Sequence, residues 1–235
     1  MGDLLSNVSI DYISYFVLIV PVIILSMIAS ARVKSAYKRY AQVGNKRGLT
    51  GAQAAQAVLD FYGIRDVMIQ RIDGELTDNF NPKTKIISLS NGVYGSCSIA
   101  AVGIACHEAG HAAQHALGYS PIKVRNALLL PANIGSKLAI PLAIIGLILG
   151  FLGLVYFGIF LYCFIMLFQL VTLPVEFDAS KRAIKVIEQQ GMLADDEIGG
   201  AKKVLKAAAM TYVAAFAASA ATLLRFLLMA RGRRR

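Results

Sequence analysis

The sequence predicts a mainly α-helical integral membrane protein with a small β-hairpin or sheet and three or four transmembrane helices. Its hydrophobic fraction is 57% and its mean hydropathy is +0.59, both above what soluble globular proteins have. Two long stretches, Tyr12 to Ala31 and Leu138 to Leu173, contain no charged residue. The run His107-Glu108-Ala109-Gly110-His111 interrupts an Ala-rich segment between them. These three observations predict a helical membrane protein that carries a candidate functional site.

The stretch Tyr12 to Ala31 is long enough to cross a hydrocarbon core roughly 30 Å thick. The residues before it include Asp3 and Asp11 but no Lys or Arg. Because a signal peptide begins with a positive segment, we expect this stretch to be a retained transmembrane helix. Basic residues follow it directly, from Arg32 to Arg47. The positive-inside rule then predicts that the N-terminus is outside and that residue 32 onward is in the cytoplasm, as expected for a bacterial plasma membrane protein.

The formal net charge is +10, a value that nucleic-acid-binding proteins also reach. The basic residues of this chain, however, lie beside apolar spans and accompany no nucleic-acid-binding motif. We therefore expect these basic residues to interact with the lipid bilayer and the protein to bind no nucleic acid.

Residues 32 to about 92 have the composition of an ordinary soluble domain. Thr50 is a candidate N-cap for a short amphipathic helix, Gly51 to Tyr62, that ends at Gly63. A strand pair is predicted next, Val67 to Ile72 and Lys85 to Ser90, with the chain turning at Asp73-Gly74 and at Thr77-Asp78-Asn79. The second strand is either an edge to which an extended substrate is added or the core strand of a small sheet.

The motif is predicted to lie in the second half of one buried helix, Gly95 to Leu117. An H-E-x-x-H pattern on a helix places His107 and His111 about one turn apart, so that both bind one zinc ion while Glu108 reaches its water. Cys106 is expected to be a small buried thiol rather than a ligand. Three ligands on one straight helix cannot converge on a tetrahedral ion, so His115 is placed outside the ligand set.

The third ligand is sought beyond the second apolar stretch. As a single helix, Leu138 to Leu173 would be about 54 Å long, so two spans joined near Gly150 to Gly153 are expected. Two crossings return the chain to the cytoplasmic side, where Glu176 becomes available to the metal. Pro174 suits the first turn of a new helix that continues to about Gln190.

Asp178 competes with Glu176 but lies about 200° around the helix from it, so only one of the two faces the ion. A purely structural role for Glu176, as a charge at a helix start, is the alternative. Two His, one Glu and a water make a hydrolytic zinc site of the gluzincin type within a zincin-like fold. Glu108 is then the general base and acid of peptide hydrolysis. Candidate oxyanion donors are Arg182, Tyr212 and His115.

The last apolar segment, Val204 to Ala230, is interrupted by Arg225 and is predicted to be a fourth membrane helix or an interfacial one, of open direction. The three cysteines are expected to be reduced. The predicted organisation is a transmembrane anchor (1–31), a cytoplasmic zincin-like part with the motif helix (32–136), a transmembrane hairpin (137–173), a Glu-ligand helix and turn (174–203), and a C-terminal apolar helix with a basic tail (204–235).

Three segments resemble the YugP-type membrane zinc metallopeptidases of bacteria, and the likeness covers nearly the whole chain. They are Cys106-His107-Glu108-Ala109-Gly110-His111-Ala112-Ala113-Gln114-His115-Ala116, Asn81-Pro82-Lys83-Thr84, and Leu173-Pro174-Val175-Glu176-Phe177-Asp178-Ala179-Ser180. The resemblance implies a zinc cofactor and peptidase activity. More distantly, the arrangement is similar to the HtpX and CAAX-prenyl peptidase group, in which the Glu opens an E-x-x-x-D motif. This chain has Ser180 where that Asp would be.

The sequence therefore predicts a membrane-embedded zinc endopeptidase that acts on a membrane-associated protein or peptide, with His107, His111 and Glu176 on the metal. An intramembrane site-2-type protease would take an Asp ligand from a later span, and residues 138–173 contain no L-D-G-like segment. A non-catalytic zinc-containing scaffold or assembly factor is the alternative of a different class, although a structural site needs no general base such as Glu108.

Overall fold

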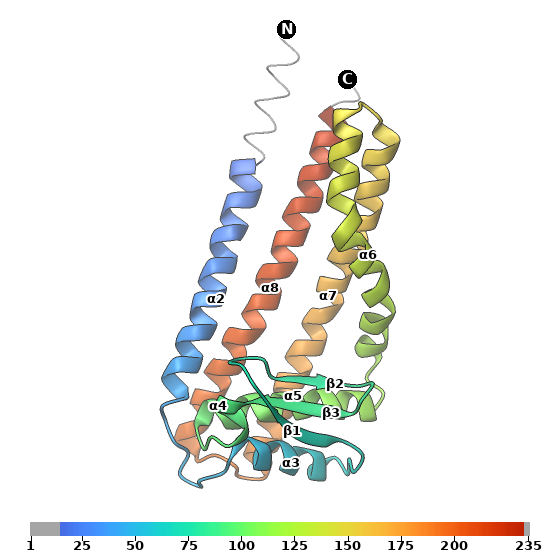
Figure 1. Ribbon diagram of the computed structural model, residues 1–235. Helices are drawn as coiled ribbons and strands as arrows, with labels where there is room; N and C mark the ends of the chain where they lie inside the picture. The colour runs from blue at the N-terminus through green and yellow to red at the C-terminus, as the bar shows by residue number, and fades with distance from the viewer. Residues whose placement is uncertain (1–14, 233–235) are drawn as a thin grey trace. The chain divides into compact units, whose positions relative to one another are not determined.

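The computed structural model describes residues 15–232, so the predictions that concern Asp3, Asp11, Tyr12 and the arginines after Gly232 lie outside it. Its elements, in chain order, are a π-helical turn η1 (Tyr15–Ile19), α2 (Val20–Tyr40), α3 (Gly51–Phe61), β1 (Met68–Ile72), β2 (Asn79–Asn81), β3 (Ile86–Ser90), α4 (Asn91–Tyr94), α5 (Ile99–Ala116), α6 (Ser120–Ile148), α7 (Leu152–Gln189) and α8 (Asp195–Gly232). Figure 1 shows long helices together with one small sheet. The protein is a mainly α-helical membrane protein, as predicted.

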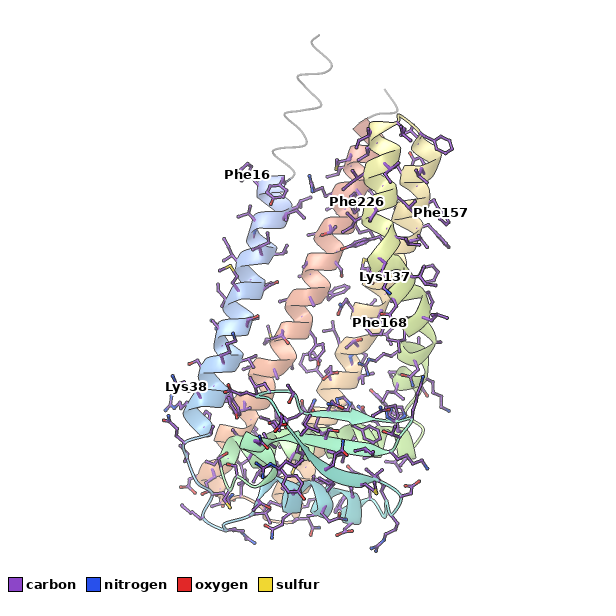
Figure 2. All side chains as sticks on the ribbon, in the orientation of Figure 1. Phe16, Lys38, Lys137, Phe157, Phe168 and Phe226 are labelled. Atoms are coloured by element: carbon purple, nitrogen blue, oxygen red, sulfur yellow. The ribbon has the colours of Figure 1, made fainter. Side chains whose placement is uncertain are left out.

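Four helical segments among the described residues are long and apolar enough to cross a membrane. They are Tyr15–Tyr40, Ser120–Ile148, Leu152–Gln189 and Asp195–Arg231. Large apolar side chains are exposed along them, and Phe157 on α7 is half exposed (Figure 2). In a bilayer these side chains face lipid, which explains why so much apolar surface is left uncovered.

The described residues form two compact units. The helical unit contains residues 15–29, 123–173 and 211–232, and the motif unit contains residues 30–122 and 174–210. Each unit has its own buried core. The domain boundaries predicted from the sequence stay predictions.

In the helical unit, α6 and α7 form a close-packed hairpin. A Cβ atom added to Gly158 would lie 2.7 Å from the carbonyl oxygen of Ala139, and one added to Gly135 would lie 2.6 Å from that of Leu161. Small residues thus let the two backbones approach, as is usual between membrane helices. The ring of Tyr162 on α7 packs edge-on against Phe226 of α8, 5.7 Å between centroids. The hairpin turns at Gly150, whose φ is +68°, within the predicted region.

The bounds of α6 and α7 differ from the predicted ones. Pro174 lies inside α7, rather than at the start of a new helix, and α6 begins at Ser120, well before Leu138. Pro131 and Pro141 lie inside α6 in the same way. A proline removes one backbone hydrogen bond but does not end a helix that is held on both sides by packing, which local sequence patterns do not reveal. Glu176 is therefore not at a helix start, so the alternative based on a helix-start charge is wrong.

In the motif unit, the predicted strand pair is part of a three-stranded sheet of order β1-β3-β2. β1 pairs in parallel with β3, from Met68 opposite Ile86 to Ile72 opposite Ser90. β2, in a segment predicted to turn, pairs antiparallel with the other side of β3. Of the hairpin and the sheet that the sequence left open, the structure has the sheet. Burial explains the order, because β3 is the most buried strand and takes the centre, leaving β1 and β2 as edges.

Two capped helices complete the motif unit. Thr50 is the N-cap of α3, as the sequence predicted, and the structure adds a capping box between Thr50 and Gln53. Helix α5 begins at Ile99, four residues later than expected, because the Ser98 side chain accepts a hydrogen bond from the backbone of Ala101 and caps it there. The core between α3, α5, the sheet and the ends of α7 and α8 contains small residues of α5, among them Ala105 and Ala109. α5 thus packs into the core on most sides, with His107 and His111 on its half-buried face.

Candidate metal centre

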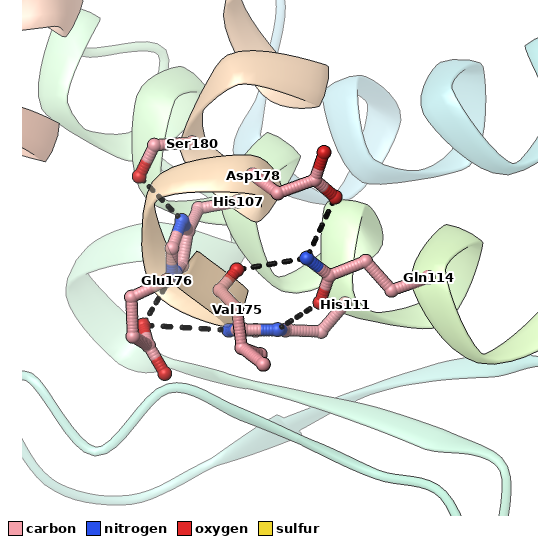
Figure 3. Close-up of polar contacts among 7 residues, drawn as sticks. All are labelled: His107, His111, Gln114, Val175, Glu176, Asp178 and Ser180. Carbon is pink, nitrogen blue, oxygen red and sulfur yellow. Dashed lines mark hydrogen bonds and ion pairs between the residues drawn. The ribbon is translucent and has the colours of Figure 1, made fainter. Parts of the chain in front are cut away.

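His107, His111 and Glu176 come together in the motif unit, the two histidines from α5 and the glutamate from α7 (Figure 3). One ligand atom from each lies within 4.8 Å of the others. Glu176 Oε2 is 3.3 Å from Nε2 of His107 and 3.6 Å from Nε2 of His111. The glutamate side chain is 4% exposed. A buried carboxylate therefore faces the same nitrogen of both imidazoles.

These distances fit a zinc ion. Ligand atoms about 2.1 Å from one ion at tetrahedral angles lie roughly 3.4 Å from one another. The two nitrogen-to-oxygen distances are close to that value. The two imidazole rings are 4.7 Å apart and nearly perpendicular, at 79°. Two nitrogen donors and one oxygen donor leave a fourth position for water or substrate, which is the donor set of a hydrolytic zinc site.

The close approach of α5 to α7 depends on Gly110, inside the motif. A Cβ atom added there would lie 2.7 Å from the carbonyl oxygen of Ala179. Gly110 and Ala179 are both buried. The absence of a side chain at Gly110 thus lets the segment of α7 that carries Glu176 lie directly against the motif.

Glu108, which lies between the two histidines in the sequence, is buried, with 9% of its surface exposed. Burial raises the pKa of its carboxyl above the ordinary range, and the neighbouring imidazoles of His107 and His111 act in the opposite direction. A carboxyl with a raised pKa holds a proton more readily than an ordinary carboxyl does, which suits a group that takes up a proton.

The second nitrogen of each histidine has a partner of its own. Ser180 Oγ is 3.1 Å from Nδ1 of His107, and Gln114 Oε1 is 3.0 Å from Nδ1 of His111. Sequence reasoning missed the role of Gln114 and noted Ser180 only as the residue in place of an aspartate. The signal was their spacing, because Gln114 follows His111 by one helical turn and Ser180 follows Glu176 by one turn.

Several residues considered from the sequence are placed elsewhere. Asp178 Oδ2 accepts hydrogen bonds from Gln114 and Arg182, and Asp178 is not among the three clustered residues. The ring of His115 packs against Phe80, 5.6 Å between centroids, and His115 is not one of the three clustered residues.

Of the other oxyanion candidates, Arg182 is hydrogen bonded to Asp178 and Tyr212 lies on α8; their roles stay predictions. Cys106 is fully buried, its Sγ 3.8 Å from Met192 Sδ. The described contacts of Cys106 are those of a packed core thiol.

Comparison with known proteins decides the family. The model of the family described as "Putative neutral zinc metallopeptidase" matches residues 15–231. The chain belongs to this family. It is also 42% identical to the "Putative membrane protease YugP" of Bacillus subtilis (strain 168), over 205 residues that cover 87% of this chain and 91% of the relative. No solved structure matches the chain.

Membership in this zinc metallopeptidase family agrees with the donor set, and zinc is the cofactor expected of it. The YugP-type resemblance seen in the sequence is confirmed, and so is the assignment to the membrane proteases.

Proposed function

We propose that this chain is a zinc-dependent endopeptidase embedded in the membrane, with His107, His111 and Glu176 as the metal ligands and Glu108 as the general base. The observation that carries the proposal is the convergence of three ligand atoms, from α5 and α7, within 4.8 Å of one another. The family name supports the same class of activity. The arrangement of two histidines and a glutamate corresponds to the gluzincin type.

In the proposed mechanism each residue has a defined task. His107, His111 and Glu176 would hold the zinc ion, which when bound would lower the pKa of a water molecule and polarise the scissile carbonyl. The carboxylate of Glu108 takes a proton from the attacking water and delivers it to the leaving amine, so that the base of one step becomes the acid of the next. The helices that carry His107, His111 and Glu176 both contribute residues to the core of the motif unit, which supports the positions of these three side chains.

The proposed substrate is an extended stretch of a protein or peptide at the membrane. The outer edge of β2 is the closest candidate for holding such a chain, because β2 contacts α5 and Phe80 of β2 packs on His115, one turn beyond His111. An added strand is held by backbone hydrogen bonds and makes little demand on side chains.

The proposed orientation places the motif unit in the cytoplasm. Its support is the cluster of basic residues at the end of α2, which includes Arg32, Lys34, Lys38 and Arg39. The exposed Glu75, in the loop between β1 and β2, offers a position for testing it. In a cysteine-depleted protein, Glu75→Cys should react with a membrane-impermeant maleimide in inside-out vesicles only. Labelling in right-side-out vesicles would contradict the orientation.

The metal ligands are tested by zinc content in the detergent-solubilised full chain. Wild type should hold about one zinc per chain, and Glu176→Ala should lose it or hold it much more weakly. Glu188→Ala is the matched control, because Glu188 is an exposed residue of the same helix that pairs with Lys202. Full zinc retention in Glu176→Ala would rule out this ligand set.

The general base is tested separately. Glu108→Gln keeps the shape of the side chain but cannot accept the proton, so cleavage of labelled casein should fall by about 10²- to 10⁴-fold while zinc content stays that of wild type. Unchanged cleavage would contradict the role of Glu108. Full function of Glu108→Gln in cells would instead favour a non-catalytic scaffold or assembly factor.

A further inference from the structure

Gln114 is a fully buried polar residue of α5, and both ends of its amide are hydrogen bonded (Figure 3). Its Nε2 donates to the backbone carbonyl of Val175 at 2.8 Å and to Oδ2 of Asp178 at 2.8 Å. Its Oε1 lies 3.0 Å from Nδ1 of His111. The amide therefore links the α7 segment around Glu176 to one histidine of the motif.

These partners determine which way the amide points. A carbonyl oxygen and a carboxylate oxygen only accept hydrogen bonds, so the two N–H groups of Gln114 must face Val175 and Asp178. If the amide were reversed, Oε1 of Gln114 would face the carbonyl oxygen of Val175 and Oδ2 of Asp178, and no hydrogen bond could form between these acceptors. Because Oε1 then faces His111, Nδ1 of that histidine must carry the proton and donate it. The lone pair of His111 is left on Nε2, the nitrogen that faces Glu176.

Asp178 is in turn held by a cation. Arg182, one turn further along α7, donates from Nε to Oδ2 of Asp178 at 2.5 Å. The guanidinium also lies over the ring of Tyr119, 5.6 Å from its centroid. The carboxylate is thus fixed as an acceptor for Gln114, on the opposite side of that amide from His111.

We propose that Asp178 and Gln114 form a positioning relay that fixes the tautomer and ring orientation of His111, so that Asp178 strengthens metal binding through the amide without touching the metal. This inference rests on the proposed ligand set. It gives Asp178, which the sequence offered as a rival ligand, a different role. A carboxylate acting on a ligand histidine is common in zinc sites, and here an amide is inserted between the two.

The two ligand histidines are held by different means. The partner of His107 is the Ser180 hydroxyl, which can either donate or accept and so does not dictate a tautomer. The partner of His111 is an amide oxygen that can only accept. The relay thus belongs to His111 alone, and its removal should affect the geometry of one ligand.

The relay is tested first by zinc affinity in the detergent-solubilised full chain, measured by competition with a chelator of known affinity. Gln114→Met keeps the length of the side chain but makes no hydrogen bond. It should bind zinc about 10- to 100-fold more weakly than wild type. Val102→Ala is the control for lost stability, because Val102 is buried in α5, more than one turn before His107. Its zinc affinity should equal that of wild type.

A double variant then tests whether Asp178 acts through Gln114. Asp178→Asn should weaken zinc binding in the wild-type background, and it should have no further effect in the Gln114→Met background. Losses that multiply in the double variant would overturn the relay. A loss from Asp178→Asn that exceeds the loss from Gln114→Met would point to Asp178 as a ligand and overturn it as well.

Replacing zinc by cobalt gives a spectrum that reports the geometry of the metal ligands. A residue that only stabilises the fold should not change this spectrum. The visible absorption of bound Co²⁺ should shift in Gln114→Met and in Asp178→Asn and stay unchanged in Val102→Ala. Asp178 is only partly buried, so Asp178→Asn should fold even if Gln114→Met does not. The cobalt spectrum of Asp178→Asn then tests the relay.

His111→Ala separates the two proposals. If it keeps wild-type zinc affinity, the ligand set fails and the relay with it. If His111→Ala loses zinc while Gln114→Met binds zinc and cobalt as wild type does, the relay alone is overturned.

Discussion

Ser180 Oγ lies 3.1 Å from Nδ1 of His107, and Ser180 follows Glu176 by one turn of α7. One face of α7 thus offers both the carboxylate that faces the two imidazoles and the hydroxyl that holds one of them. In the HtpX group an aspartate occupies the position of Ser180. The serine of this chain nevertheless reaches the imidazole, so the difference in residue type does not leave Nδ1 of His107 without a partner.

Ser180→Ala should weaken zinc binding by less than about 10-fold, which is a smaller loss than we expect for Gln114→Met. The loss should be small because the Ser180 side chain is within reach of solvent. Ser180 is only partly buried, so a water molecule can replace its hydroxyl beside His107. The measurement is zinc affinity by chelator competition. A loss as large as that of Glu176→Ala would show that the hydroxyl does more than orient the ring.

Gly110→Ala should push α5 and α7 apart, because its Cβ would lie 2.7 Å from the carbonyl oxygen of Ala179. Overpacking of this kind costs about 1–3 kcal/mol of unfolding free energy, and we expect weaker zinc binding in addition. Gly199→Ala is the matched control, since an added Cβ there meets nothing within 4 Å. That change should stabilise α8 by about 1 kcal/mol. Wild-type zinc affinity in Gly110→Ala would contradict the close contact.

Cys106 should resist alkylation in the folded protein at pH 8. Burial raises the pKa of its thiol, so the reactive thiolate is absent at that pH and the reagent has no access. Cys97, which is only partly buried, should react first. Mass spectrometry of iodoacetamide-treated protein measures both, with a sample unfolded in guanidinium as the control. Modification of Cys106 at the rate of Cys97 would show that the core around α5 opens readily.

Removal of zinc by a chelator should lower the midpoint of thermal unfolding of the wild-type protein. A ligand that binds only the folded state stabilises it by about 3 kcal/mol at a free concentration 100 times its dissociation constant. The same chelator should leave the midpoint of Glu176→Ala unchanged, since that variant has little zinc to lose. Differential scanning fluorimetry in detergent compares the two. An equal shift in both proteins would locate the zinc at some other site.

Local patterns in the sequence were sufficient for several features. The N-cap at Thr50, the strands around Ile69 and Leu89 and the turn at Gly150 all lie where the residue pattern predicted them. Each of these depends on residues a few positions apart, whose backbone preferences act on one another directly. The same locality explains the errors at Pro174 and at the start of α5, where packing or a serine cap overrode the pattern.

By itself, the sequence determined the class of protein and the placement of the two motif histidines on one helix face. Long uncharged stretches must lie in lipid, and histidines four residues apart on a helix must share a face, because both follow from the geometry of one continuous segment. Only the tertiary structure decided the pairing of β1 with β3, the choice of Glu176 over Asp178 to face the histidines, and the placement of Gln114 and Ser180 behind them. These relationships join segments far apart in the chain, and they depend on how α5 packs against α7 at Gly110, which no local preference encodes.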